Sequence, residues 1–136
     1  MKSLYILLIL LTILTQAMSQ NSDYTSIEET INSYFDGMVN HNAESFSAAF
    51  HSSATMKWIG EDYTEANAIK ALSDYVNAND TVKTKIIAIN IEGEIASAKL
   101  ELEYDSFYFI DYMQLMKING TWKIVSKAYT KKSKEF

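Results

Sequence analysis

The chain has 136 residues, 48% of them hydrophobic and 17 of them Phe, Trp or Tyr, which is enough for one packed domain and too little for two. All basic residues are lysines, acids outnumber them 17 to 12, and the net charge is -5. This balance excludes a dedicated nucleic-acid binder, which needs a positive surface and usually arginine. Cysteine is absent, which excludes disulfides, thiolate metal sites and a thiol nucleophile.

The first nineteen residues have the pattern of a secretory signal peptide. Lys2 gives a positive start, Leu4 to Leu14 is almost entirely apolar, and Ala17 and Ser19 have the spacing of a cleavage site. A retained membrane anchor is the alternative, but an apolar run of about eleven residues is shorter than the roughly 20 that span a bilayer. We therefore expect residues 1–19 to be removed, which leaves residues 20–136 as a single secreted or periplasmic domain with no membrane attachment.

Three helices are predicted in the first half of the chain. The first begins at Ser26, where Ser26 and Glu29 form a capping box, and Gly37 lies near its end. Its apolar residues share one face at helical spacing: Ile27, Ile31, Tyr34, Phe35 and Met38. A second, shorter helix is expected over residues 43–50 behind Asn42 as N-cap, and a third over residues 65–76.

Strands dominate the rest of the chain. A short strand is expected over residues 54–59, and four longer ones over residues 81–91, 95–104, 107–118 and 121–129, the last two joined by a turn at Asn119-Gly120. The strand over residues 95–104 alternates, so its alanine and leucine side is expected to be buried. The strand over residues 107–118 is apolar on both faces, which indicates a covering layer on each side. We expect one face to line a cavity under the helices and the other to form a homodimer.

This order of elements resembles the nuclear transport factor 2-like (NTF2-like) superfamily. Within it, the segments YFDGMVNHNAESFSAAFHSSATM, INIEGEIASAKLELE and FYFIDYMQLMKINGTWKIVSKAY resemble the putative lumazine-binding family. The resemblance covers about residues 24–129. It implies an α+β fold, in which a cone-shaped, curved antiparallel sheet packs on three N-terminal helices around a ligand-sized pocket, as in NTF2-like and cystatin-like proteins. The resemblance does not show whether the protein is a binding protein or an enzyme, because the superfamily contains both.

Three polar residues are candidates for catalysis. Asp111 lies on an otherwise apolar strand face, where desolvation would make its carboxyl group a useful general acid or base. Two structural alternatives remain for Asp111. It either forms a structural hydrogen bond to a Tyr, Trp or backbone group, or lies near the mouth of the cone. Tyr34 and Asp111 are similar in kind to the tyrosine and acids around the pocket of ketosteroid-isomerase-like relatives. His51 either caps or packs near the second helix, or lines the pocket, whereas His41 is expected at the surface. The two histidines have no metal-site spacing, so neither a metal nor a cofactor is expected.

Two functions from different classes remain open. The first is non-catalytic binding of a small aromatic or apolar molecule, pterin-like if the family name is a guide. Its expected binding residues are Tyr34, Phe35, Trp58, Phe109, Asp111 and Met113. Side chains of these types belong more often to the hydrophobic core than to a ligand-binding site. The second is an isomerase or dehydratase, in which Asp111 moves a proton and Tyr34 or His51 polarises a carbonyl. The binding function needs fewer assumptions, and the enzyme needs Asp111 to point inward.

Overall fold

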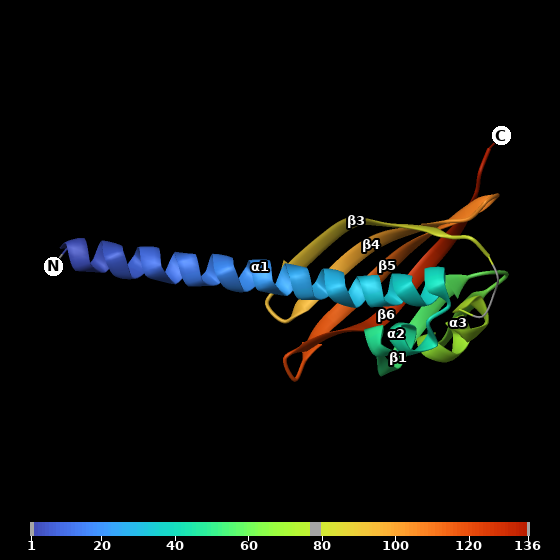
Figure 1. The fold of residues 1–136 in the computed structure, drawn as a ribbon, viewed down its shortest axis with the longest axis horizontal. Coiled ribbons are helices and arrows are strands. Elements are labelled where there is room, and N and C mark those ends of the chain that lie inside the picture. The colour runs from blue at the N-terminus through green and yellow to red at the C-terminus, as the bar shows by residue number, and fades with distance from the viewer. Residues whose placement is uncertain (1, 77–79, 136) are drawn as a thin grey trace.

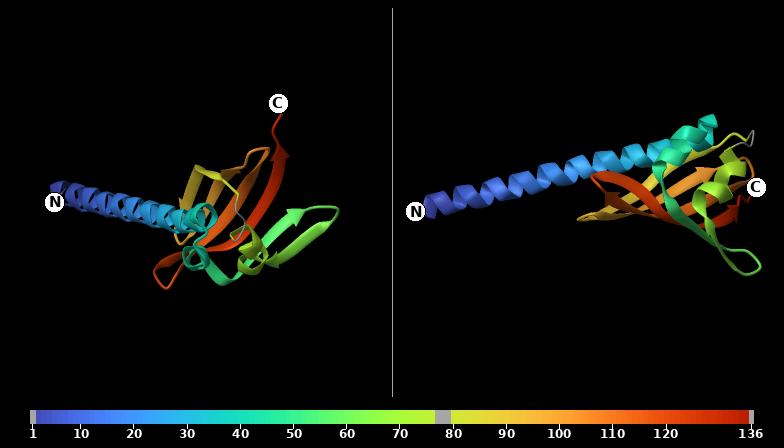
Figure 2. Two further views of the ribbon diagram at one scale, coloured as in Figure 1. Left: turned by 45° about the vertical axis from the view of Figure 1, so that its right-hand side comes forward. Right: turned by 90° about the horizontal axis from the view of Figure 1, so that it is seen from below.

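The computed structural model describes residues 2–76 and 80–135. Three helices come early in the chain and lie on one face of a curved sheet (Figures 1 and 2). The sheet has six strands in the order β2-β1-β6-β5-β4-β3 and does not close into a barrel. The α+β class with a curved sheet packed on three helices is therefore confirmed.

Helix α1 (Lys2–Asn40) is much longer than the sequence pattern predicts. The predicted start at Ser26 is wrong for this chain, because no proline or glycine interrupts residues 2–26 and the helix continues through them. From Ile27 onward the predicted apolar face is buried against the sheet. The helix ends at Asn40, and His41 follows with a φ of 58°, so Gly37 is not its end signal.

Gly37 instead permits a close approach of two helices. A Cβ atom at this position would lie 2.3 Å from Cβ of Phe46 in α2 (Ala43–Ala49), so a side chain there would push the helices apart. Helix α2 begins as predicted, since Asn42 Oδ1 accepts a hydrogen bond from the Ser45 backbone N–H at 3.1 Å. The ring nitrogen Nδ1 of His41 lies 2.8 Å from the Val76 carbonyl, which ties this exposed residue to the end of α3.

The first half of the sheet differs from the prediction. Strand β1 (Phe50–Ile59) begins four residues early, and β2 (Tyr63–Asn67) occupies the start of the expected third helix. Strand β2 forms because it pairs antiparallel with β1. Helix α3 (Ala68–Val76) begins directly after Asn67, whose Oδ1 accepts a hydrogen bond from the Lys70 backbone N–H. Strand β1 also pairs with β6, in parallel, which makes the sheet mixed.

The second half of the sheet follows the prediction closely. Strands β3 (Lys83–Glu92), β4 (Ile95–Glu103), β5 (Phe107–Ile118) and β6 (Thr121–Ser133) form an antiparallel run. The β5–β6 turn uses Asn119 and Gly120, both with positive φ. On β4 the buried residues are the predicted ones: Ala96, Ala98, Leu100 and Leu102. The inner face of β5 is buried, and its outer face leaves Tyr112 and Met116 exposed.

The two parts of α1 have opposite surroundings. Residues 27–38 cross the concave face of the sheet, and the first part of the helix projects well beyond the sheet (Figure 1). The large apolar residues from Tyr5 to Leu14 are each more than half exposed. In the described part of the chain, no helix has the length and apolar character needed to cross a membrane.

Candidate functional site

Three polar side chains meet inside the cone, beneath the helices. Tyr34 of α1 and Asp111 of β5 are fully buried, and Lys127 of β6 is 3% exposed. The Tyr34 hydroxyl donates to Asp111 Oδ2 at 3.0 Å, and Lys127 Nζ donates to the Tyr34 oxygen at 2.9 Å. Lys127 Nζ also forms an ion pair with Asp111 Oδ2 at 2.8 Å. We call these three residues the buried triad.

The positions of the triad follow from the strand register. Asp111 and Met113 are alternate residues on the inner face of β5, and Met113 lies opposite Lys127 on β6. Lys127 reaches the inner face because β6 contains an irregularity: Leu115 pairs with Ile124 but Gln114 pairs with Ser126, so Val125 is an extra residue. The extra residue changes which side of the strand faces the core, so both Ile124 and Lys127 are buried.

The electrostatics of the triad favour a protonated tyrosine. Burial raises the pKa of Tyr34 well above its ordinary value, and the charge of Asp111 and the hydrogen bond to it add to this shift. The Lys127 ammonium also lies 5.2 Å from the ring centre of Tyr34 and 5.4 Å from that of Tyr129, within cation–π range. Asp111 Oδ1 is buried and has no hydrogen-bond partner among the described residues.

A small cavity adjoins the triad. Its volume is about 20 Å³, room for one water molecule, which needs about 10–15 Å³. Its lining combines aromatic, methionine and leucine side chains with a single charged one: Tyr34, Met38, Met56, Leu72, Tyr75, Leu102, Phe109, Lys127 and Tyr129. Leu72 and Tyr75 come from α3, so this short helix forms one wall.

The expected binding residues occupy different places around this cavity. Tyr34 and Phe109 line it. Trp58 is half-buried and stacks on Tyr129 at 5.9 Å between ring centres, so it supports the wall from outside. Phe35 packs beside Tyr34 in the core, with their ring centres 5.7 Å apart.

His51 does not join the triad. It lies at the beginning of β1, where its Nδ1 accepts hydrogen bonds from the Ser53 hydroxyl at 2.8 Å and the Ser53 backbone N–H at 3.2 Å. Asp111 does point inward, as the enzyme hypothesis requires, and it contacts Tyr34 as that hypothesis expects. Of the two proposed partners for Asp111, the structure therefore places only Tyr34 beside it.

Sequence reasoning missed Lys127. In the segment TWKIVSKAY, strict alternation from Trp122 and Ile124 puts Ser126 and Ala128 inside and Lys127 outside. The irregularity at Val125 reverses this assignment, and no turn residue or glycine marks it. A signal available in the sequence was the change of parity along the strand: the large side chains Trp122 and Ile124 stand at even positions, whereas Tyr129 stands at an odd position, as Lys127 does.

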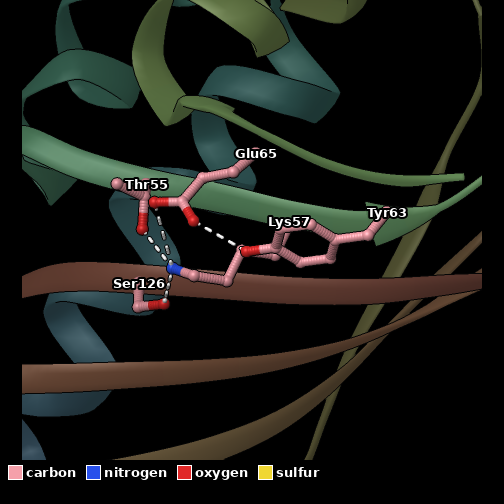
Figure 3. A network of polar contacts seen from close by, with 5 residues as sticks. All are labelled: Thr55, Lys57, Tyr63, Glu65 and Ser126. Atoms are coloured by element: carbon pink, nitrogen blue, oxygen red, sulfur yellow. Dashed lines mark hydrogen bonds and ion pairs between the residues drawn. The ribbon is translucent and has the colours of Figure 1, made fainter.

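A second cluster with the same chemical groups lies at the surface. Lys57 of β1 contacts the hydroxyl of Thr55, the hydroxyl of Ser126 at 3.2 Å and Glu65 Oε1 at 3.9 Å (Figure 3). Tyr63 donates to Glu65 Oε2 at 2.7 Å. The side chains of Lys57 and Glu65 are 33% and 44% exposed. Water therefore competes for the lysine and the carboxylate of this surface cluster.

The fold and the buried site define an NTF2-like protein. Among solved structures, the chain is similar to an NTF2-like protein of unknown function from Shewanella baltica OS155, with a TM-score of 0.74, 28% identity, and coverage of 82% of this chain and 94% of that one. It is also similar to an NTF2-like protein of unknown function from Methylobacillus flagellatus KT, with a TM-score of 0.72, 34% identity, and coverage of 82% and 93%.

Residues 22–130 match the family described as "Putative lumazine-binding", and the chain belongs to that family. A protein with a cystatin-like fold from Nostoc punctiforme PCC 73102 shares the fold at a TM-score of 0.63 and 15% identity, covering 81% of this chain and 91% of that one. Comparison with curated protein sequences gives no match.

Proposed function

We propose that this protein binds a small aromatic or apolar molecule without transforming it, in the cavity beside the buried triad. Family membership supports a small-molecule binding fold. The observation that carries the proposal is a buried, charge-balanced ion pair at the wall of an otherwise apolar cavity. A buried ion pair is seldom needed for stability, because well-packed apolar residues of similar volume often do as well or better. The proposal therefore assigns the triad a role in binding.

Binding requires the cavity to widen. Its present volume admits about one water molecule, so an aromatic ring must displace wall side chains. Met38 and Met56 are suited to this because methionine has flexible, polarisable side chains that repack easily. Tyr75 of α3 is 41% exposed, so it can move toward solvent without leaving a buried gap.

A thermal-shift screen of small uncharged aromatic molecules tests the proposal. A molecule bound in the cavity raises the Tm of the wild type and not that of Leu72→Trp, which fills the cavity from α3. Ile59→Trp, at a position that is 76% exposed, is the matched control and keeps the wild-type response. Equal shifts in the wild type and Leu72→Trp would place binding elsewhere and contradict the proposal.

An enzyme of the isomerase or dehydratase type is the second candidate. The hydrogen bond from Tyr34 to Asp111 favours it, since a proton donor and a carboxylate lie 3.0 Å apart in a buried site. The ion pair with Lys127 weighs against it, because Lys127 Nζ and the Tyr34 hydroxyl already occupy Asp111 Oδ2. Asp111→Asn separates the two candidates: turnover of a bound molecule stops if Asp111 is the base, and a binding protein shows no turnover with either residue.

Export is proposed on the surroundings of the first helix segment. The large apolar side chains from Tyr5 to Leu14 are each more than half exposed, so we expect their removal to cost the fold little. Asp23 then lies in the first turn of the remaining helix, where it accepts hydrogen bonds from Lys117 at 2.7 Å and Trp122 Nε1 at 3.0 Å. Intact-mass measurement of the exported protein should give a chain that begins at Gln20, and a chain that begins at Met1 would contradict this.

Homodimerisation through the outer sheet face is also proposed. Tyr112 and Met116 are 58% and 43% exposed on the outer face of β5, and Tyr108 and Ile110 are half-buried beside them. Large apolar side chains exposed on a sheet face are typical of an interface, and the polar residues among them, such as Gln114 of β5 and Lys99 opposite Tyr112 on β4, would lie within it. Light scattering of wild type and Tyr112→Glu tests it: the dimer mass should fall to that of a monomer, and Tyr63→Glu on β2 should leave it unchanged.

A further inference from the structure

Lys127 has one hydrogen-bond donor to spare. An ammonium has three N–H groups. Within the described residues, Lys127 gives two of them to Tyr34 and Asp111. Its side chain also lines the cavity, whose other lining residues are uncharged. The third N–H is therefore available to an acceptor atom inside the cavity.

The charge of the site is already balanced. Asp111 neutralises Lys127 at 2.8 Å, and both are almost fully buried. An anionic ligand would add a third charge and leave one negative charge without a partner in a buried, mostly apolar cavity, which weakens its binding. A cationic ligand would meet the ammonium of Lys127 at the cavity wall and be repelled. An uncharged acceptor avoids both costs.

We propose that the cavity selects an uncharged, planar, carbonyl-bearing molecule, with its carbonyl oxygen on Lys127 and its apolar body between the aromatic and methionine walls. This inference rests on the proposed binding function and adds the chemical class of the ligand. Asp111 does not itself line the cavity, and its unpartnered Oδ1 has capacity for one further donor, such as a water molecule. Because Asp111 balances the charge of Lys127, it makes the site favour an uncharged ligand over a charged one.

Benzamide and benzoate are matched probes of this inference. They have nearly the same shape, and at pH 7 only benzoate is charged. Binding is followed by the methyl signals of methionine in ¹³C-methyl-labelled protein, because Met38 and Met56 line the cavity. Met116, exposed on the outer sheet face, is the internal control.

The wild type is expected to bind benzamide at least about tenfold more tightly than benzoate, with shifts at Met38 and Met56 and none at Met116. In Asp111→Asn the lysine charge has no counter-charge, so the preference should reverse toward benzoate. If this variant does not fold, Asp111→Leu/Lys127→Met serves instead; it keeps the charge balance but lacks the donor, and its affinity for benzamide should fall by about tenfold.

Two other results would each have a distinct meaning. Benzoate binding to the wild type as well as benzamide does, or an unchanged preference in Asp111→Asn, overturns charge selection and leaves the cavity a binding site. If Asp111→Leu/Lys127→Met keeps the wild-type affinity for benzamide, the lysine does not bind the carbonyl oxygen, and the inference is likewise overturned while the cavity remains a binding site. If neither probe shifts Met38 or Met56 in the folded wild type, the cavity admits no aromatic molecule, and the proposed function fails together with this inference.

Discussion

The buried triad and the surface cluster contain the same groups in different surroundings. Each joins a lysine, a tyrosine hydroxyl and a carboxylate, Tyr34, Asp111 and Lys127 in one and Tyr63, Glu65 and Lys57 in the other. The lysine–carboxylate distance is 2.8 Å inside and 3.9 Å at the surface. Burial removes the competition of water, so the inner groups depend on one another, whereas the outer groups remain solvated; ligand recognition is therefore proposed for the inner groups alone.

Removing the lysine from each cluster should give the largest contrast. Lys127→Met leaves the Asp111 carboxylate buried without its ion pair, and we expect it to lower the free energy of unfolding by about 3–5 kcal/mol. Lys57→Met should lower it by less than about 1 kcal/mol, because its pair is exposed. Urea unfolding of both variants measures this difference. Equal losses would show that burial does not set the energetics of the triad.

Removing both charges should restore much of the loss. Asp111→Leu/Lys127→Met replaces the ion pair with apolar side chains, and we expect it to be more stable than Lys127→Met alone by about 1–4 kcal/mol. The double-mutant cycle, completed by Asp111→Leu, gives the coupling free energy between the two residues. Additive losses from the two substitutions would mean that the charges do not interact as the 2.8 Å distance indicates.

The hydroxyl groups give a smaller contrast. Tyr34→Phe removes the donor to Asp111 and the acceptor for Lys127, and we expect a loss of about 1–3 kcal/mol in the free energy of unfolding. Tyr63→Phe removes a solvated hydroxyl and should stay within about 0.5 kcal/mol of the wild type. Thermal and urea unfolding together measure both losses. A near-zero effect at Tyr34 would mean that its hydroxyl is not part of the network.

The alkaline limit of stability should also reflect the buried tyrosines. The pKa of Tyr34 is raised well above its ordinary value of 10.0, and burial with the nearby Asp80 raises the pKa of Tyr104 to about 12. Above about pH 10 the unfolded chain releases these protons while the folded chain keeps them, so the stability present below pH 10 is lost as pH rises.

The test is urea unfolding at several pH values between about pH 9 and about pH 11. Tyr34→Phe should lose stability less steeply over this range than the wild type, because one of the titrating groups is gone. Tyr112→Phe, at an exposed position, should follow the wild type. A Tyr34→Phe slope equal to that of the wild type would mean that Tyr34 gives up its proton as readily in the folded chain.

The elements that sequence predicted well are those fixed by local patterns. The alternation of Ala96 to Leu102 and the Asn119-Gly120 turn define β4 and the β5–β6 hairpin without reference to the rest of the chain. Strand β2 was missed because Tyr63–Asn67 is extended only through its pairing with β1. The parallel pairing of β1 with β6 is likewise a contact between distant parts of the chain.

The candidate site was predicted in part. Asp111 is recognisable because a carboxylate on an apolar strand face needs a partner, and Tyr34 because it lies on the buried face of a helix. The partner that balances the charge was hidden by the irregularity at Val125, which turns Lys127 inward against the local alternation. The size of the cavity depends on how α3 packs and has no counterpart in any local pattern.

The most direct test of the central claim, that the buried triad anchors a small molecule, is native mass spectrometry of the protein purified from cells that produce it. Three forms are compared: the wild type, Lys57→Met and Asp111→Leu/Lys127→Met. A retained small molecule is expected on the first two and not on the third, which keeps its core but lacks the anchor. The same molecule retained equally by all three forms, or by none, would contradict the account.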